Sequence, residues 1–142
     1  MAISSAVCTS WKQEVMQGLH NFTTSTGNAF KVALYTSSAT LGATTTAYSA
    51  TNEISGTGYS AGGLALTNVT PTTSGTTAYT DFADAQWTSA TFTANGCLVY
   101  NSTNSNRAVF AIAFGGDVSV TSGTFTITWP TADSSNAILR IA

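Results

Sequence analysis

Apolar and polar residues alternate along this chain from residue 30 onward. In Phe30-Lys-Val-Ala-Leu-Tyr35 and Thr124-Phe-Thr-Ile-Thr-Trp129, every second side chain is aromatic or aliphatic. A period of two is typical of a strand with one buried face. Further segments with strand character, separated by Gly, Ser, Asn and Asp, are 64–69, 79–82, 86–92, 97–100, 108–114, 118–120 and 137–141. Between two of them, residues 101–106 are expected to form a hairpin loop.

This spacing predicts an all-β fold. Many short strands about ten residues apart, with turns between them, are typical of an antiparallel β-sandwich, here jelly-roll-like. Only one helical segment precedes them, so a parallel βαβ sheet is not expected. At 142 residues the chain is expected to form a single domain, 1–142. Residues 37–63 are the least regular and are expected to form a long loop.

A different period occurs near the start of the chain. Trp11, Val15 and Leu19 recur every four residues with polar side chains between them, which predicts a short amphipathic helix with Ser10 as its N-cap. A helix this short is marginal on its own and must pack against something. Its own sheet and a neighbouring subunit both remain open as that partner. Residues 1–25 are therefore predicted to be a helical docking segment, whose candidate contact residues are Trp11, Val15, Met16 and Leu19.

The composition removes several classes of function. The chain has 27 Thr and 17 Ser, but only four Lys+Arg, six Asp+Glu and one His. Dispersed cations cannot form the basic stripe that nucleic acid requires, so no nucleic-acid partner is expected. No apolar run approaches the length of a membrane span, and the first residues lack the basic and apolar regions of a classical signal peptide. We therefore expect no membrane partner. We also expect the protein to be synthesised in a cytosol.

One segment matches a catalytic motif. Gly58-Tyr-Ser-Ala-Gly62 fits G-x-S-x-G, which requires a helix after the serine and a histidine later in the chain. A strand pattern follows instead, and the single histidine, His20, lies upstream at the end of the expected helix. A hydrolase function for Ser60 is therefore disfavoured.

No metal or cofactor site is predicted. The turn-associated carboxylates do not form a D-x-[DN]-x-[DN]-G loop, and aspartate is common in turns for reasons of its own backbone hydrogen bonding. The two cysteines lack a C-x-x-C or metal-ligand spacing and are expected to be free thiols. The carboxylates are Asp81, Asp84, Asp117 and Asp133, and the cysteines are Cys8 and Cys97. The side chains thus indicate no catalytic, cofactor-binding or metal-binding residue, and the chain is not expected to be an enzyme.

An ordered set of segments resembles a known family. The segments are Phe30-Lys-Val-Ala-Leu-Tyr-Thr36, Asn52-Glu-Ile-Ser-Gly-Thr-Gly-Tyr-Ser-Ala-Gly-Gly63, Asp81-Phe-Ala-Asp84 with Trp87, and Pro130-Thr-Ala-Asp-Ser-Ser-Asn-Ala-Ile-Leu-Arg-Ile141. Together they resemble small virion structural proteins of tailed bacteriophages. The similarity runs from Trp11 to the C-terminus, although no single motif is diagnostic.

The resemblance implies a non-enzymatic role on the phage particle. Within this family the chain is most similar to capsid cement or decoration proteins, which bind and stabilise the lattice of the major capsid protein and commonly assemble as trimers. It implies a homotrimer on the capsid surface of the virion, assembled in the bacterial host cytoplasm, with no cofactor. The alternative on the same particle is a neck, tail or fibre component that binds a host receptor or glycan.

Overall fold

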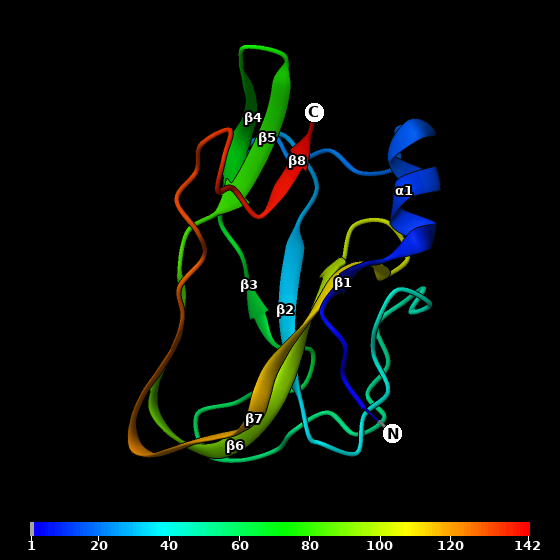
Figure 1. Cartoon of the computed structure of the whole chain (residues 1–142). Coiled ribbons are helices and arrows are strands. Elements are labelled where there is room, and N and C mark those ends of the chain that lie inside the picture. The colour runs from blue at the N-terminus through cyan, green and yellow to red at the C-terminus, as the bar shows by residue number, and fades with distance from the viewer. Residues whose placement is uncertain (1) are drawn as a thin grey trace.

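The structure, a computed structural model, describes residues 2–142 and contains two antiparallel sheets and one helix (Figure 1). The larger sheet has the order β1-β7-β6-β2-β3 and the smaller one β4-β5-β8. This confirms an antiparallel, sandwich-like all-β fold with one short N-terminal helix. The elements are β1 (Ala6–Val7), α1 (Thr9–Met16), β2 (Phe30–Tyr35), β3 (Leu64–Ala65), β4 (Asn68–Ser74), β5 (Thr77–Phe82), β6 (Ala85–Asn101), β7 (Arg107–Ile127) and β8 (Leu139–Ile141).

A single long hairpin replaces most of the separate strands expected in the second half of the chain. Strands β6 and β7 pair from Asn101 with Arg107, next to the predicted hairpin loop, as far as Ala85 with Ile127. The predicted strands 86–92 and 97–100 are both parts of β6. Those at 108–114, 118–120 and 124–129 lie in β7, except that residues 128 and 129 follow its end. Side-chain alternation identified the strands but not their continuity.

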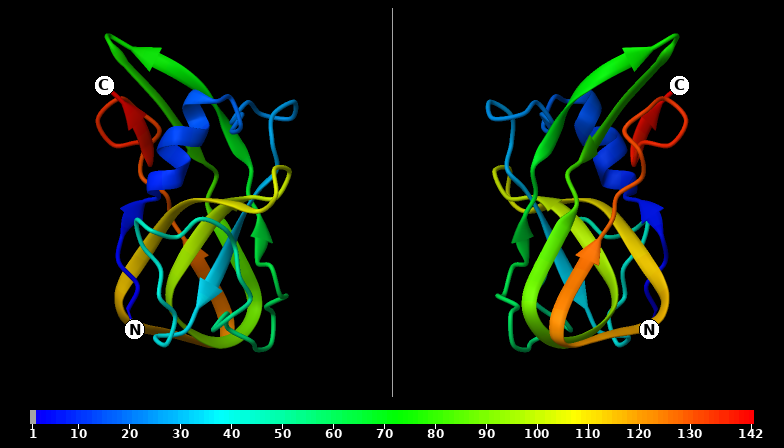
Figure 2. Two further views of the ribbon diagram at one scale, coloured as in Figure 1. Left: turned by 90° about the vertical axis from the view of Figure 1, so that its right-hand side faces the viewer. Right: turned by 90° about the vertical axis from the view of Figure 1, so that its left-hand side faces the viewer.

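The hairpin bends back on itself near its middle. Ala94 pairs with Val118 and Gly96 with Ala113, so residues 114–117 of β7 lie opposite only Asn95 of β6. Extra residues in one strand of a pair bend that strand and increase its twist. At the bend the backbones also approach closely, because a Cβ on Gly96 would lie 2.6 Å from the carbonyl oxygen of Ile112. The two curved halves of the hairpin enclose the interior (Figure 2).

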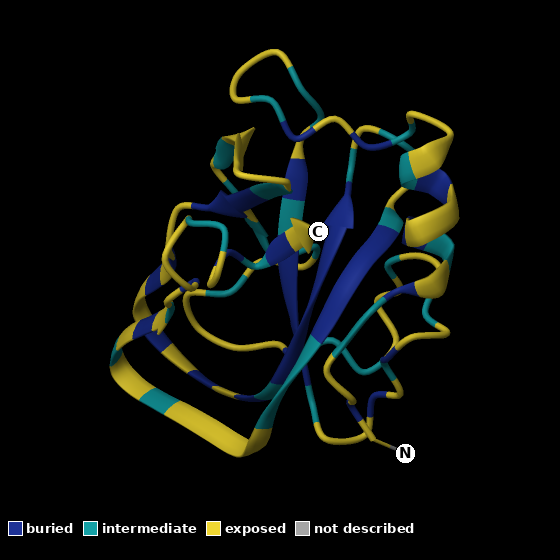
Figure 3. Cartoon of the chain, turned by 45° about the horizontal axis from the view of Figure 1, so that its top comes forward, coloured by how far each residue is buried: buried dark blue, intermediate teal, exposed yellow. Residues whose placement is uncertain are grey.

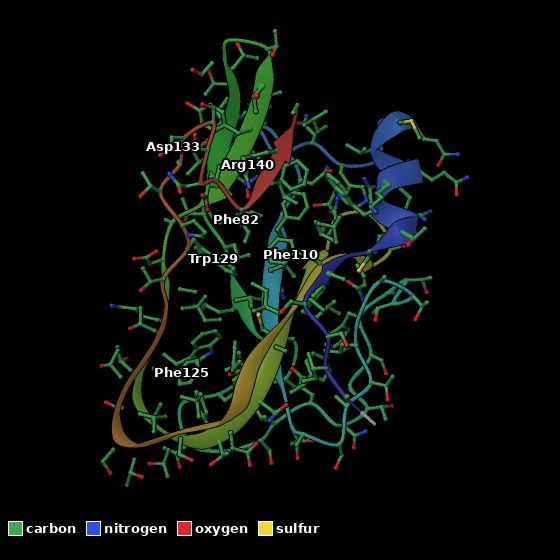
Figure 4. All side chains as sticks on the ribbon, viewed as in Figure 1. Phe82, Phe110, Phe125, Trp129, Asp133 and Arg140 are labelled. Atoms are coloured by element: carbon green, nitrogen blue, oxygen red, sulfur yellow. The ribbon has the colours of Figure 1, made fainter. Side chains whose placement is uncertain are left out.

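Aromatic side chains fill the space between the two halves. Phe22 and Phe30 are stacked, with ring centroids 4.4 Å apart, and further contacts continue through Phe82, Trp129 and Phe110. Figure 4 shows Phe110, Phe125 and Trp129 in this interior. The half of the hairpin next to its loop is buried, whereas the bend is largely exposed (Figure 3).

The predicted loop between β2 and β3 is confirmed, and one carboxylate organises it. Glu53 accepts hydrogen bonds from the hydroxyls of Tyr48 and Tyr59, both at 2.6 Å, and from the backbone N–H of Gly62 at 2.8 Å. The Tyr59 oxygen also accepts a bond from the backbone N–H of Leu34 in β2. Burial, followed by the hydrogen bond to Glu53, raises the pKa of Tyr48 to about 12 and also raises the pKa of Tyr59. Both phenols therefore remain protonated donors at neutral pH.

The smaller sheet starts where one predicted strand divides. The segment 64–69 contributes β3 to the larger sheet and the first residues of β4 to the smaller one. Pro71 lies in β4, an edge strand, where the pairing with β5 shifts between Val69 and Thr72. Proline has no N–H to donate and is tolerated on an edge or at a bulge. The predicted strand 137–141 is shortened to β8, and the β4–β5 hairpin projects from the body (Figure 1).

Replacement of Tyr59 by phenylalanine tests the Glu53 clamp. Tyr59→Phe leaves the Leu34 N–H without its acceptor and removes one donor to Glu53. We expect the free energy of unfolding to fall by about 1–3 kcal/mol, measured by urea denaturation. Tyr79→Phe is the matched control, since the Tyr79 hydroxyl makes no hydrogen bond to residues 2–142. Equal losses in the two variants would contradict a specific role for the clamp.

Candidate docking surface

The helix α1 begins and ends at positions other than those predicted. Its N-cap is Cys8 rather than Ser10, without a side-chain cap, and the buried Ser10 hydroxyl has no partner among the described residues. At its C-terminus, the N–H of Gly18 donates to the carbonyl of Val15 and that of Leu19 to the carbonyl of Glu14. Gly18 has a φ of 74°. This is a Schellman motif, so Leu19 follows the helix rather than continuing it.

A buried hydrogen-bond network fixes α1 on the hairpin. Glu14 accepts a 2.6 Å bond from Arg107 at the start of β7 and a 3.1 Å bond from Nε2 of His20. Nδ1 of His20 accepts from the side-chain amide of Asn101, at 3.1 Å. Since Asn101 Oδ1 accepts from the N–H groups of Thr103 and Asn104, its amide cannot be turned around without losing those bonds. The neutral ring with its proton on Nε2 satisfies every partner.

The four predicted contact residues differ in their environments. Trp11 is buried in the core, with its ring 6.3 Å from those of His20 and Phe22, so for Trp11 the partner is the protein's own interior. Val15 and Leu19 are half-buried. Met16 is 82% exposed. Of the four residues, Met16 therefore offers the largest accessible apolar side chain.

A groove separates α1 from β8. We define the α1–β8 groove by the residues Trp11, Lys12, Val15, Met16, Leu139, Arg140 and Ile141, which line a hollow of about 700 Å³. Its walls are mostly apolar, and Ile141 is 59% exposed. A second hollow of about 430 Å³ continues along Trp11, Val15, Leu139 and Ile141 toward His20 and Tyr79. The sequence pattern indicated the helix side of this groove, but it gave no sign that β8 lies opposite.

The groove also contains an unpaired strand edge. Within residues 2–142, β8 pairs only with β5, so the other side of β8 has no strand partner. Peptide groups on such an edge are available for an added strand. Lys12 and Arg140 supply the positive charge of the groove. Arg140 lies on β8, with Asp133 in the preceding segment (Figure 4).

A second apolar cleft lies inside the bent hairpin. Ile112, Phe114, Val120, Phe125 and Trp129 are among the residues that line a hollow of about 580 Å³. None of its lining residues is charged. Val118, which is 41% exposed, also lines this cleft, but the cleft lacks the positive charge of the α1–β8 groove.

The residues of the catalytic motif do not meet. Ser60 is exposed in the loop, whereas both ring nitrogens of His20 are bonded to Glu14 and Asn101. The neighbouring Tyr59 points its hydroxyl at Glu53 instead. His20, which follows the helix in the sequence, is a buried member of the network described above.

The aspartates make turn and backbone contacts. Asp81 is buried and accepts from the N–H groups of Phe82 and Ile138, and burial raises its pKa. Asp133 accepts from the N–H groups of Ser135 and Asn136. Within residues 2–142 no three His, Cys, Asp or Glu side chains are grouped as metal ligands.

Both cysteines are buried free thiols. Burial raises the pKa of Cys8 to about 11 and that of Cys97 to about 12, so both are protonated at neutral pH. Neither thiol is therefore set up as a nucleophile.

No protein-family model matches the chain, and comparisons with curated proteins and with solved structures also gave no match. No helix in the described part of the chain is both long enough and apolar enough to cross a membrane.

The His20 network predicts a loss of stability in mild acid. Burial lowers the pKa of His20, outweighing the opposing effect of Glu14, so the unfolded chain binds a proton more readily than the folded one. The free energy of unfolding should therefore fall as the pH drops below about 6.5, by at most about 1.4 kcal/mol per pH unit for one proton. Denaturation curves between pH 7.5 and 5.5 measure this slope. In His20→Gln the slope should flatten, and an unchanged slope would contradict the assignment.

Proposed function

We propose that this protein is a structural component of a bacteriophage virion, and that it acts as a capsid cement protein on the lattice of the major capsid protein. The ordered resemblance to small virion proteins supports this role. So does the all-β fold, in which the few charged groups mostly hold the protein's own loops and helix together.

The observation that carries the proposal is the α1–β8 groove. It combines an exposed apolar side chain on each wall with an unpaired strand edge, and this combination suits a protein partner better than a small molecule. A cement protein works through repeated protein contacts, with the lattice and between its own copies, because many weak contacts held in a fixed geometry give high total affinity. Binding only to the assembled lattice then stabilises the lattice by mass action.

Immunogold electron microscopy of intact phage particles tests the location. Label spread over the head is expected for a cement protein. Label restricted to the neck, tail or fibres would favour the alternative, a component that binds a host receptor or glycan. Absence of the protein from purified particles would overturn both virion functions.

A reconstitution experiment tests the action. Heads that lack the protein should release their DNA at a lower temperature than complete heads, and adding the purified chain should restore the difference. Bovine serum albumin at the same concentration controls for nonspecific protection. Heads that bind the chain without any change in release temperature would contradict the cementing role.

A further inference from the structure

The large exposed apolar side chains occur at two places. Within residues 2–142 they are Met16 and Ile141, which flank the α1–β8 groove, and Val118, which is 41% exposed at the bend of β7. Val118 follows the exposed Asp117. The remaining exposed surface is dominated by small and polar residues. Both places are therefore more apolar than the surface around them.

The bend presents a short free strand edge, residues 117–120, which we call the bend strip. Its sequence, Asp117-Val-Ser-Val120, alternates polar and apolar residues. Val118 and Ser119 pair with β6 on one side, and no strand within residues 2–142 pairs with the other side. The space beside the two residues before Asp117 is also open, because a Cβ on Gly115 or Gly116 would meet no atom within 4 Å.

The groove presents a matching alternation on β8. Leu139, Arg140 and Ile141 all line the groove at the free edge of β8. Because side chains alternate along a strand, Arg140 belongs to the other face of the small sheet from Leu139 and Ile141. When two strands pair, side chains on the same face become neighbours and opposite charges stabilise the pair. Placed beside β8, the bend strip would put its valines on the face of Leu139 and Ile141. The same register would put Asp117 on the face of Arg140.

The charges also fit. Lys12 and Arg140 are two of the four cations in the chain, and neither forms an ion pair with another residue in 2–142. One Asp117 oxygen accepts from Asn95, which leaves the second free for a cation. Asp84 and Asp133 do not offer the same combination, since their sequence neighbours are alanine and serine.

We propose that the bend strip of one copy of this chain adds to the free edge of β8 in a second copy and fills the α1–β8 groove. Both halves of the contact are present in every copy, so no other protein is needed. In Figure 1, α1 and β8 lie near the top of the molecule and the bend of the β6–β7 hairpin at the bottom, so one chain cannot make this contact with itself. The association is therefore head-to-tail, and it produces either a closed ring or an open chain.

Charge exchange tests this contact in the purified full-length protein. Arg140→Glu and Asp117→Arg should each weaken self-association about tenfold, because each places like charges opposite one another. The double variant Asp117→Arg/Arg140→Glu should recover the wild-type association, because its exchanged charges attract again. Sedimentation velocity over a concentration series measures all four proteins, and circular dichroism verifies that each is folded.

Two further variants complete the experiment. Val118→Thr, which keeps the shape of the side chain and adds a hydroxyl, should weaken association. Lys31→Glu is the control for net charge, since Lys31 lies on β2 outside the groove, and it should leave association unchanged. A monomer at all concentrations, association insensitive to residues 117 and 140, or an equal effect of Lys31→Glu would each overturn the proposal.

The result is separable from the capsid role. A chain that remains monomeric yet cements heads would overturn the head-to-tail contact and leave the cement function standing. If the groove variants of such a monomer lose head binding, the occupant of the groove is a capsid protein instead of a second copy. Self-association with the expected charge dependence, in a chain that never binds heads, would support the head-to-tail contact and overturn the cement function.

Discussion

Strands β6 and β7 stay hydrogen-bonded to each other on both sides of a bend at which four residues of β7 lie opposite one of β6. The two halves of this hairpin face each other across the aromatic interior, which Phe30 of β2 and Phe82 of β5 also fill, so the depth of the core depends on the angle of the bend. The close backbone approach at Gly96 and the extra residues of β7 set that angle together. The helix, the long loop and the small sheet then pack onto surfaces that the bent hairpin has already defined.

Ionised groups are scarce in this chain, and two of them have a large structural effect. Glu14 connects the helix to the first residue of β7 and to His20, and Glu53 collects two phenols and a backbone N–H from a loop without regular structure. Each carboxylate connects segments that do not pair with each other through their backbones. A charged acceptor forms stronger hydrogen bonds than a neutral one, which makes a single side chain sufficient for each task.

The sequence predicts this fold well where the polarity of each side chain matches its own burial. Alternation between apolar and polar side chains located β2 and most of β7, and the helix followed from the spacing of Trp11 and Val15. The single buried face expected for β2 was wrong, because the strand is buried on both faces and only Lys31 is half-buried. The bend could not be predicted, because the sequence Phe114-Gly-Gly-Asp117 is equally typical of an exposed strand and of a turn. The end of the helix was readable in principle, since Gly18 is the residue that a Schellman motif favours, but the periodicity of Leu19 concealed it.

The docking surface was predictable only in part for the same reason. Periodicity showed that the helix had an apolar face but not which of its residues the core would take, and Trp11 proved to be internal while Met16 remained outside. The opposite wall comes from β8, more than a hundred residues later in the chain. A groove formed by distant segments leaves no local pattern, because neither segment alone carries the shape.

Pro71 makes the two edges of the small sheet chemically different. The edge at β4 lacks one N–H and is interrupted by a shift in pairing, whereas the edge at β8 has no proline and no such shift. A strand can therefore be added at β8 far more readily than at β4. Any assembly that extends this sheet therefore has a direction, because a strand is added at the β8 edge and the β4 edge stays at the opposite end.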